Sequence, residues 1–418
     1  MKLSKLAEEI TTSPILTIAA EINARIKQGE KIFNLTVGDF DPQYFPIPER
    51  LTSLIIDAYK AHQTNYPGAF GLSELRLAIA EMISTFCNID LKPDELLIAS
   101  GSRPLIYSLY KTVVNPGEKV LFPVPSWNND YYCQLLNAEA VIIDTTAKNN
   151  FFPSASDLEP YVQDAAMIAL CSPQNPTGTL MSKQQLTEIC ELVVNENKRR
   201  SSDQKPLYIM FDQVYWLLTF SDSGFFHALN VCPEIRDYAI FIDGLSKGFA
   251  GTGVRVGWAN GPLHVIAKMR ALVAHIGAWA PKPEQVAVAQ FLGNLKDVNQ
   301  FLQQFRFQLQ SRLQDVYQGF MDLKSKGYDV DAIAPQAAIY LSLRINLIGK
   351  KTAEGKLLNT HEDVHQYLLN QAGIGILPFS WFGANNQAEW YRISVGSCSE
   401  QQIDEMLKQF ESALSALN

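Results

Sequence analysis

Two charged residues stand where buried strands are expected to end. Asp212 closes the apolar run 207–212, and Lys247 comes four positions after the apolar run 239–243. Burying a carboxylate costs free energy unless a cation meets it, so Asp212 needs a positively charged partner. A lysine and an acid that converge on one crevice are candidates for covalent or acid–base chemistry, whereas a lone surface lysine is simply solvated.

Small residues surround this lysine. The stretch "DGLSKGFAGTGVRVGW" (243–258) holds five glycines among sixteen positions, and Arg255 follows Lys247 by eight residues. Glycine clears side-chain volume and lets the backbone approach another group closely. One cleft would then hold an acid, a lysine and an arginine.

Polar turns follow three other apolar runs. Ser102 and Arg103 lie in "SGSRP" (100–104), a turn that opens a helix and leaves free backbone N–H groups suited to a phosphate. Trp127 lies in "PVPSWNND" (123–130), and Asn175 in "SPQNPTG" (172–178), where the following proline favours an extended residue. Taken singly, each segment is explained equally well by ordinary turn chemistry or by packing of a large aromatic.

Short apolar runs and helical patterns alternate from about residue 50 to residue 295. This alternation is typical of an α/β fold, and near-continuous apolar runs suit strands of a mostly parallel sheet covered on both faces by helices. Ligands collect at the carboxyl ends of parallel strands, so the candidate residues should meet at one edge of the sheet. Strands are expected at 96–100, 119–123, 140–143, 167–171, 207–212, 239–243 and 255–260.

Three changes in periodicity suggest the domain organisation. Residues 1–45 form an arm with a helix at 14–29 that joins a small domain, 46–295 form a large domain, and 296–418 form a small α+β domain. In the large domain, Ser182 and Gln185 form a capping box before a crossover helix. The basic run "NKRRSS" (197–202) is expected to lie in a polar turn before a strand, as a solvated loop rather than a ligand patch.

Composition excludes several classes of partner. The chain has 418 residues, 47% of them hydrophobic, and a net charge of −8, which argues against nucleic acid. No apolar run reaches the length of about 18 residues that a membrane span needs, and the N-terminal stretch lacks the apolar core of a signal peptide. The six cysteines lack the spacing of a metal site or a disulfide framework. We expect a cytoplasmic protein that binds neither a membrane nor a metal.

Eight segments together resemble a known family. They follow one another in the order and at about the spacing found in fold-type I, pyridoxal 5'-phosphate-dependent aminotransferases of class I/II, which include aspartate and aromatic aminotransferases. The match runs nearly end to end. The segments are "NLTVGDFDP" (34–42), "NYPGAFGLSELR" (65–76), "SGSRP" (100–104), "PVPSW" (123–127), "SPQNPTG" (172–178), "DQVY" (212–215), "SKGFAGTGVRVGW" (246–258) and "YRISVGS" (391–397).

The resemblance implies how the large domain holds pyridoxal 5'-phosphate. Lys247 would form an aldimine with the cofactor aldehyde and, once freed by the substrate, carry the proton that turns the cofactor into its pyridoxamine form. Asp212 would keep the ring nitrogen protonated. Arg255 would pair with the phosphate, helped by Ser102 and Arg103 at the start of a helix.

Further residues are assigned by the same resemblance. Asn175 and Tyr215 would hydrogen-bond the ring oxygen of the cofactor, with Tyr215 tuning the catalytic linkage, and Trp127 would stack on the ring. Tyr66 resembles the tyrosine that reaches the phosphate of the neighbouring subunit. A homodimer with shared active sites is therefore implied.

The substrate side is implied in the same way. Arg392 resembles the arginine that binds the α-carboxylate of the substrate, Asn175 and Trp127 would border the substrate, and Gly38 would let the N-terminal arm pass close to it. Arg103 stands where some aspartate-type relatives carry a lysine for a distal carboxylate. Glutamate and 2-oxoglutarate are expected substrates, with aspartate as a further candidate. Aromatic donors stay open, because an aromatic-lined pocket could be formed by Trp279, Phe379, Trp381 and Phe382.

Other reactions use nearly the same residues. A carbon–sulfur β-lyase or an aminocyclopropane-carboxylate synthase differs mainly in which bond the pocket directs the cofactor to break. A cofactor-binding regulator of DNA is an alternative of another class. The acidic charge and the lack of an N-terminal DNA-binding segment in this sequence argue against it.

Overall fold

A computed structural model describes residues 2–220, 224–385 and 389–417. In the described part of the chain, seven strands form a central sheet in the order β2-β8-β7-β6-β5-β3-β4. All neighbours pair in parallel except β8, which runs antiparallel to both β2 and β7. The prediction of a mostly parallel central sheet is confirmed. The strands are β2 (Leu96–Ala99), β3 (Lys119–Val124), β4 (Glu139–Asp144), β5 (Ala165–Cys171), β6 (Tyr208–Asp212), β7 (Ala239–Gly244) and β8 (Gly257–Asn260).

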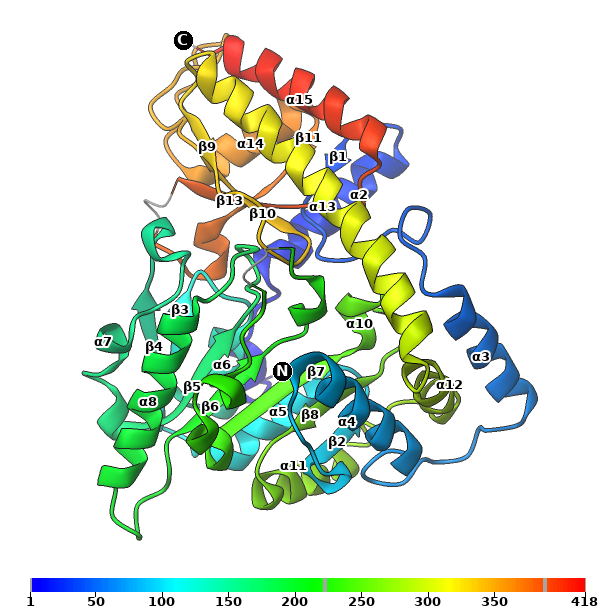
Figure 1. The fold of residues 1–418 in the computed structure, drawn as a ribbon. Coiled ribbons are helices and arrows are strands. Elements are labelled where there is room, and N and C mark those ends of the chain that lie inside the picture. Colours follow the sequence, from blue (N-terminus) through cyan, green and yellow to red (C-terminus); the bar gives the residue numbers. More distant parts are fainter. Residues whose placement is uncertain (1, 221–223, 386–388, 418) are drawn as a thin grey trace.

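Helices cover both faces of this sheet, as the near-continuous apolar runs predict (Figure 1). Alternate residues of a strand point to opposite faces, so Leu97 packs with one helical layer while Leu96 and Ile98 pack with the other. One layer comprises α5 (Ser102–Val113), α6 (Asn129–Leu136) and α11 (Leu263–His275). The other comprises α3 (Glu49–Lys60), α4 (Ser73–Cys87), α8 (Lys183–Arg199) and α12 (Lys282–Leu292).

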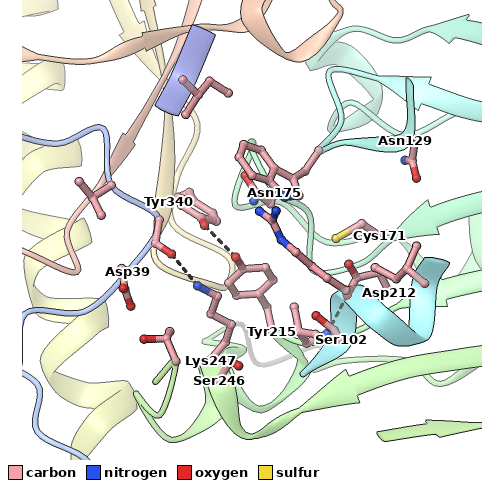
Figure 2. A pocket seen from close by; sticks show the side chains of 18 of the residues that line it. Asp39, Ser102, Asn129, Cys171, Asn175, Asp212, Tyr215, Ser246, Lys247 and Tyr340 are labelled. Carbon is pink, nitrogen blue, oxygen red and sulfur yellow. Dashed lines mark hydrogen bonds between the residues drawn. The ribbon is translucent and has the colours of Figure 1, made fainter. Parts of the chain in front are cut away.

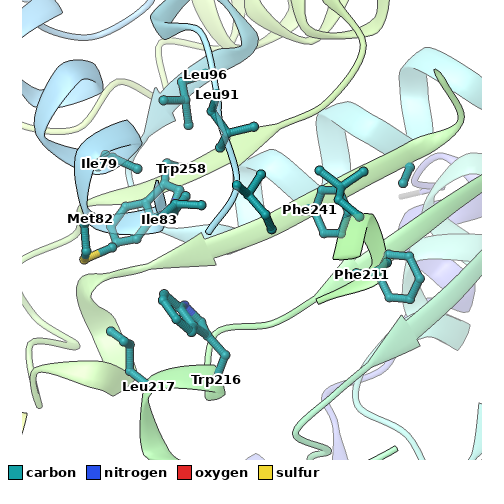
Figure 3. Packing of buried hydrophobic residues seen from close by; sticks show 14 of the residues in the cluster. Ile79, Met82, Ile83, Leu91, Leu96, Phe211, Trp216, Leu217, Phe241 and Trp258 are labelled. Carbon is teal, nitrogen blue, oxygen red and sulfur yellow. The ribbon is translucent and has the colours of Figure 1, made fainter. Parts of the chain in front are cut away.

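Large aromatic side chains fill the second of these layers. Figure 3 shows Trp258 of β8 beside Ile79, Met82 and Ile83 of α4. Trp258 is fully buried. The core therefore ties the strands that end at the candidate residues to a rigid helical layer.

Short helices connect these elements. They are η1 (Pro93–Glu95), η2 (Ala147–Asn149), α7 (Ala155–Leu158), η3 (Val162–Asp164), η4 (Trp216–Leu218), α9 (Ala228–Val231), η5 (Pro233–Asp237), α10 (Leu245–Gly248) and η6 (Phe379–Phe382). One of them, α10, directly follows β7 and carries the candidate Lys247, and η4 begins just after the candidate Tyr215.

The crossover helix α8 begins where the sequence predicts. Ser182 accepts from the backbone N–H of Gln185, and the Gln185 side chain accepts from that of Ser182. The expectation for the basic run was wrong in part. Lys198 and Arg199 are solvated, but residues 197–199 still belong to the helix. Arg200, whose side chain is only 8% exposed, donates to Glu196 and to the carbonyl groups of Val162 and Ala165. A local pattern could not show these acceptors, because they come from a distant segment.

A second sheet lies beside the long helix α13 (Leu295–Ser325), in the yellow-to-red part of the chain (Figure 1). In the described residues this sheet has four antiparallel strands in the order β12-β13-β10-β9. Its apolar face packs on α13 and on two further helices. These elements are β9 (Val330–Ala332), β10 (Tyr340–Ile345), β12 (Leu377–Pro378), β13 (Trp390–Ser394), α14 (His361–Ala372) and α15 (Glu400–Ser415). The predicted domain boundaries at 45 and 295 stay predictions.

The N-terminal arm joins this smaller part. After α1 (Lys5–Glu9), helix α2 (Pro14–Lys27) packs Ile18 and Ile22 against Leu369 and Leu377. Strand β1 (Phe33–Asn34) then pairs in parallel with β11 (Ile374–Gly375). The chain passes from β1 straight to the edge of the central sheet.

The described residues contain neither a candidate membrane-spanning helix nor a candidate metal cluster. None of the described helices combines the length and the apolar character needed to cross a bilayer. Within the same residues, no group of three or more His, Cys, Asp or Glu side chains is arranged to hold a metal ion.

Candidate active site

The predicted site residues meet in one pocket between the two sheets. This pocket has a volume of about 370 Å³ and is lined by all the predicted site residues except Tyr66. Figure 2 shows Lys247, Tyr215, Asp212 and Asn175 converging on it. The lining residues among the predicted set are Gly38, Ser102, Arg103, Trp127, Asn175, Asp212, Tyr215, Lys247, Arg255 and Arg392.

Strand ends account for this convergence. Asp212 is the last residue of β6, Lys247 lies on the short helix after β7, and Asn175 lies in the loop after β5. Arg255 precedes β8 in the chain. Because β8 is antiparallel, its beginning lies at the same edge as the ends of the other strands, where Gly257 pairs with Gly244 and with Ala99.

Lys247 is held inside the pocket by the N-terminal arm. Its Nζ donates to the carbonyl oxygen of Gly38 at 2.5 Å. Burial lowers the pKa of this amine to about 8, with Arg392 and Arg103 lowering it further and Asp39 and Asp212 opposing the change. A lysine with this pKa is partly neutral near physiological pH and can act as a nucleophile or a base.

Asp212 lacks the cation that its position calls for. Burial raises the pKa of this carboxyl to about 6, against the opposing effects of a backbone N–H and of Lys247. The backbone N–H of Val214 donates to it at 3.3 Å. Across the described residues no lysine or arginine forms an ion pair with Asp212. A protonated ring nitrogen would supply the missing positive charge.

The start of α5 forms a space suited to an anion. Gly101 precedes the helix with φ +92°, and a Cβ at Gly101 would lie 2.2 Å from a terminal nitrogen of Arg255. Arg255 donates to the carbonyl groups of Thr252 and Ser100 at 2.8 and 2.9 Å, which fixes its guanidinium beside the free N–H groups of the helix. Ser102, Ser246 and Thr252 add hydroxyl groups to the pocket wall. These donors fit a phosphate.

Arg392 is a buried cation without an acidic partner. It is only 2% exposed, donates to Asn175 Oδ1 at 3.0 Å and to the carbonyl of Thr36, and leaves its Nε without a hydrogen-bond partner in the described residues. Its Cζ lies 4.6 Å from the ring centre of Tyr340 and 5.0 Å from that of Phe382. An arginine remains charged when buried, so this group is suited to a carboxylate from outside the chain.

Arg103 provides a second guanidinium at the pocket. It is exposed, and its Cζ lies 5.7 Å from the ring centre of Trp127. The four aromatic residues expected to form an alternative lining lie elsewhere. Trp279 packs on Tyr66, Phe379 on Phe151 and Trp381 on His365, while Phe382 packs on Trp127 behind the wall; none of them lines the pocket.

Tyr66 lies outside the pocket of its own chain. Its side chain is 83% exposed, and its only ring contact among the described residues is with Trp279, at 5.4 Å between ring centres. An exposed aromatic is what a contact with a second subunit would use. Its predicted role stays a prediction.

Sequence reasoning missed several residues that line the pocket. Tyr340 bonds to Tyr215, Asp39 is the charge that most strongly raises the pKa of Lys247, and Asn129 accepts from Tyr110 at 2.9 Å. Ser246 stands inside the glycine-rich stretch, directly before Lys247. The sequence around Tyr340 does not indicate a functional role, because Tyr340 lies at the start of an apolar run that is typical of a buried strand.

The pocket thus fits pyridoxal phosphate on several independent observations. It offers a lysine with a lowered pKa, a partly buried carboxylate without an ion-pair partner, an anion site at a helix start and a buried arginine with an unpaired donor. The roles of the individual residues stay predictions.

Comparison with known proteins identifies the family. The family described as aminotransferase class I and II matches residues 30–410. An aspartate aminotransferase of Bacillus sp. (strain YM-2) is 26% identical over 411 residues, which cover 97% of this chain and 99% of that protein. A probable aspartate/prephenate aminotransferase of Rhizobium leguminosarum bv. phaseoli is also 26% identical, and the match covers 95% of each chain.

Solved structures give the same result. The aspartate aminotransferase of Rhizobium meliloti has a TM-score of 0.90 and 25% identity, with 100% of both chains covered. That of Thermus thermophilus, solved with maleate, has a TM-score of 0.87 and 22% identity, covers 99% of this chain and 100% of that one, and supports the fold alone. This chain therefore belongs to the class I and II aminotransferases, pyridoxal 5'-phosphate-dependent enzymes that move an amino group between an amino acid and a 2-oxo acid.

Proposed function

We propose that this aminotransferase acts on dicarboxylic substrates, with glutamate and 2-oxoglutarate as one pair and aspartate as a further donor. One observation carries the proposal: two guanidinium groups, Arg392 and Arg103, line one pocket, and within the described ranges neither forms an ion pair. A dicarboxylate presents two anionic ends to meet them.

Pyridoxal phosphate supplies an electron-accepting ring that stabilises negative charge at the α-carbon of the substrate. Lys247 would hold the cofactor covalently and would take the proton from the α-carbon, for which its lowered pKa is suited. Asp212 would keep a proton on the ring nitrogen, and Asn175 and Tyr215 would hydrogen-bond the ring oxygen. Arg255, Ser102 and the start of α5 would hold the phosphate.

The remaining residues orient the substrate. Arg392 binds the α-carboxylate, and Arg103 binds the distal carboxylate beside Trp127. The placement of Phe379 and Trp381 outside the pocket lining weakens the case for an aromatic-selective pocket. Among the described residues, the aromatic rings that line the pocket are those of Trp127, Tyr132, Tyr215 and Tyr340.

Donor selectivity tests this proposal. The Arg103→Ala variant should lose about tenfold or more of kcat/KM for glutamate and aspartate, because a charge-assisted hydrogen bond is lost, and much less for phenylalanine. The matched control is Lys111→Ala, which removes one positive charge from an exposed position on the same helix. Equal losses for acidic and aromatic donors in Arg103→Ala would refute the dicarboxylate assignment.

The same assays separate transamination from the lyase alternative. Product formation should require a 2-oxo acid acceptor and yield its amino acid. Release of pyruvate and ammonia from a cysteine-type donor without an acceptor would instead indicate a β-lyase.

We also propose a homodimer in which Tyr66 completes the phosphate site of the partner subunit. The exposure of Tyr66 and its distance from its own pocket support this arrangement. A cytoplasmic location stays a prediction.

A further inference from the structure

Tyr340 lies between the two groups of residues assigned above to the cofactor and to the substrate. It opens β10 in the smaller sheet, is only 1% exposed, and lines the pocket with its ring and hydroxyl. Figure 2 shows its hydroxyl turned toward that of Tyr215. The two oxygens are 2.7 Å apart, and the ring centres are 5.5 Å apart at an interplanar angle of 68°.

Tyr340 is confined both at its backbone and at its hydroxyl. A Cβ at Gly178 would lie 2.2 Å from the carbonyl oxygen of Tyr340, and the hydroxyl of Ser342 donates to the carbonyl of Thr177 at 2.7 Å. On the other side, a Cβ at Gly38 would lie 2.6 Å from the Tyr340 hydroxyl. The hydroxyl therefore has little freedom to leave Tyr215.

Either phenol can donate in the hydrogen bond between them, so its direction depends on whether Tyr215 donates its proton elsewhere. Each phenol carries one proton, and burial raises the pKa of both groups, so both are protonated near neutral pH. If Tyr215 donates its proton to an oxygen in the pocket, its own oxygen is free to accept, and the donor at 2.7 Å is Tyr340. Tyr340 then fixes the direction in which the Tyr215 proton points and strengthens that donor.

The ring of Tyr340 serves the second group. The guanidinium carbon of Arg392 lies 4.6 Å from its centre, within the range of a cation–π contact. Because the buried Arg392 has no acidic partner among the described residues, this contact is one of the few that stabilise its charge.

We propose that Tyr340 is a positioning residue with two separable parts: its hydroxyl orients the proton of Tyr215 toward the ring oxygen of the cofactor, and its ring holds Arg392 in place for the α-carboxylate. This inference rests on the proposed roles of Tyr215 and Arg392, and it assigns a function to a residue that lies in neither group.

Two substitutions at the same position separate the parts. Tyr340→Phe keeps the ring and removes the hydroxyl, whereas Tyr340→Leu removes both. The first readout is the pH midpoint of the visible absorbance of the holoenzyme without substrate. A weaker donor at Tyr215 stabilises the deprotonated, negatively charged ring oxygen less, so both variants should raise this midpoint by about half to one pH unit.

The second readout is the dissociation constant of maleate, an unreactive dicarboxylate, measured by its effect on the same absorbance. Tyr340→Phe should change it less than about twofold, because the ring under Arg392 remains, while Tyr340→Leu should raise it about tenfold. Both variants are first checked for cofactor content and for a cooperative unfolding transition. If Tyr340→Leu fails to fold, Tyr340→Phe still decides the hydroxyl part, and Tyr340→His, which keeps a flat ring, is compared with Tyr340→Met for the second.

Tyr215→Phe separates this inference from the proposed function. If Tyr215→Phe leaves the midpoint unchanged, the assigned role of Tyr215 is wrong. If Tyr215→Phe raises it and Tyr340→Phe does not, the hydroxyl part of the present inference is overturned alone. Equal maleate affinity in Tyr340→Phe and Tyr340→Leu overturns the ring part.

Discussion

The lowered pKa of Lys247 results from a balance of burial and nearby charge. Burial lowers the pKa of its amine, and Asp39 is the charge that most strongly opposes the change. Because only the neutral amine attacks an aldehyde, the rate at which the cofactor-free chain captures pyridoxal phosphate should rise with pH around a midpoint of about 8. The Asp39→Asn variant should shift that midpoint down by about half a unit or more, since it removes a stabilising negative charge.

Stopped-flow absorbance of cofactor capture would measure this midpoint. Asp41→Asn is the matched control, because Asp41 lies two positions away in the same segment and does not line the pocket. An equal shift in both variants would show that the effect is not specific to the charge beside Lys247.

At the scale of single residues, the sequence predicts the functional residues that lie at or near the end of a predicted strand. Lys247, Asp212 and Arg255 each stand next to a predicted strand, and the central sheet brings them together. Tyr340 and Asp39 could not be predicted in this way. The contacts that define them come from Tyr215 and Lys247, which are 125 and 208 positions away in the chain.

Among the elements, the start of α5 depends on the absence of a side chain at Gly101. An alanine there would have an unfavourable positive φ, and its Cβ would displace the guanidinium of Arg255. Gly117 provides the control, because it also has a positive φ, +81°, but a Cβ at that position would have no neighbouring atom within 4 Å. Both alanine variants should lose about 1–2 kcal/mol of unfolding free energy, and only Gly101→Ala should weaken binding of pyridoxal phosphate, by about tenfold or more.

Equilibrium dialysis and urea unfolding would measure these two quantities. Equal cofactor affinity in the two variants would mean that the position of Arg255 does not control phosphate binding.

A further acid, Asp243, is buried near the end of β7 and links it by a hydrogen bond to the segment that follows β6. Its carboxylate accepts from the indole of Trp216 in η4 at 2.7 Å and from the backbone N–H of Gly244 at 2.6 Å. Burial is the dominant effect and raises the pKa of Asp243 from 3.8 to about 8. Between these two values the unfolded chain has released this proton while the folded chain still holds it. The stability of the cofactor-free protein should therefore fall as pH rises through this interval.

Asp243→Asn should flatten this dependence, because the amide does not titrate, and should also destabilise the fold. Trp216 and Gly244 donate to different oxygens of Asp243, and in asparagine one of these oxygens is replaced by an NH2 donor, so one of the two hydrogen bonds is lost. Urea unfolding at several pH values provides the measurement. A slope that is the same in the variant would exclude Asp243 as its source.

Element boundaries in the central sheet followed the apolar runs to within a few residues, because strands buried on both faces leave a strong local signal. The orientation of β8 and the acceptors of Arg200 carried no such signal. Both are set by pairing with segments distant in the chain.

For the whole molecule, the placement of Tyr66 predicts shared sites. Light scattering should give twice the mass of the 46.7 kDa chain. Lys247→Ala and Tyr66→Ala variants, each impaired alone, should recover activity when unfolded together and refolded, because hybrid dimers contain one site with both Lys247 and Tyr66.

Tyr161→Ala serves as the control for a lost surface tyrosine. It is also exposed but precedes the start of β5, at the opposite edge of the sheet, and should leave cofactor affinity unchanged. A mixture with no more activity than its components would place Tyr66 outside the partner's site.

The antiparallel strand β8 limits where residues can be inserted into this chain. Only seven residues separate Lys247 from Arg255, and both ends of this connection face the pocket. An insertion there would displace one of the two residues in the pocket. The polar turn at 201–204 lies at the far edge of the sheet and does not line the pocket. Tags and fused domains should therefore be inserted at that turn. Insertions and deletions in related sequences are expected there before they occur between Lys247 and Arg255.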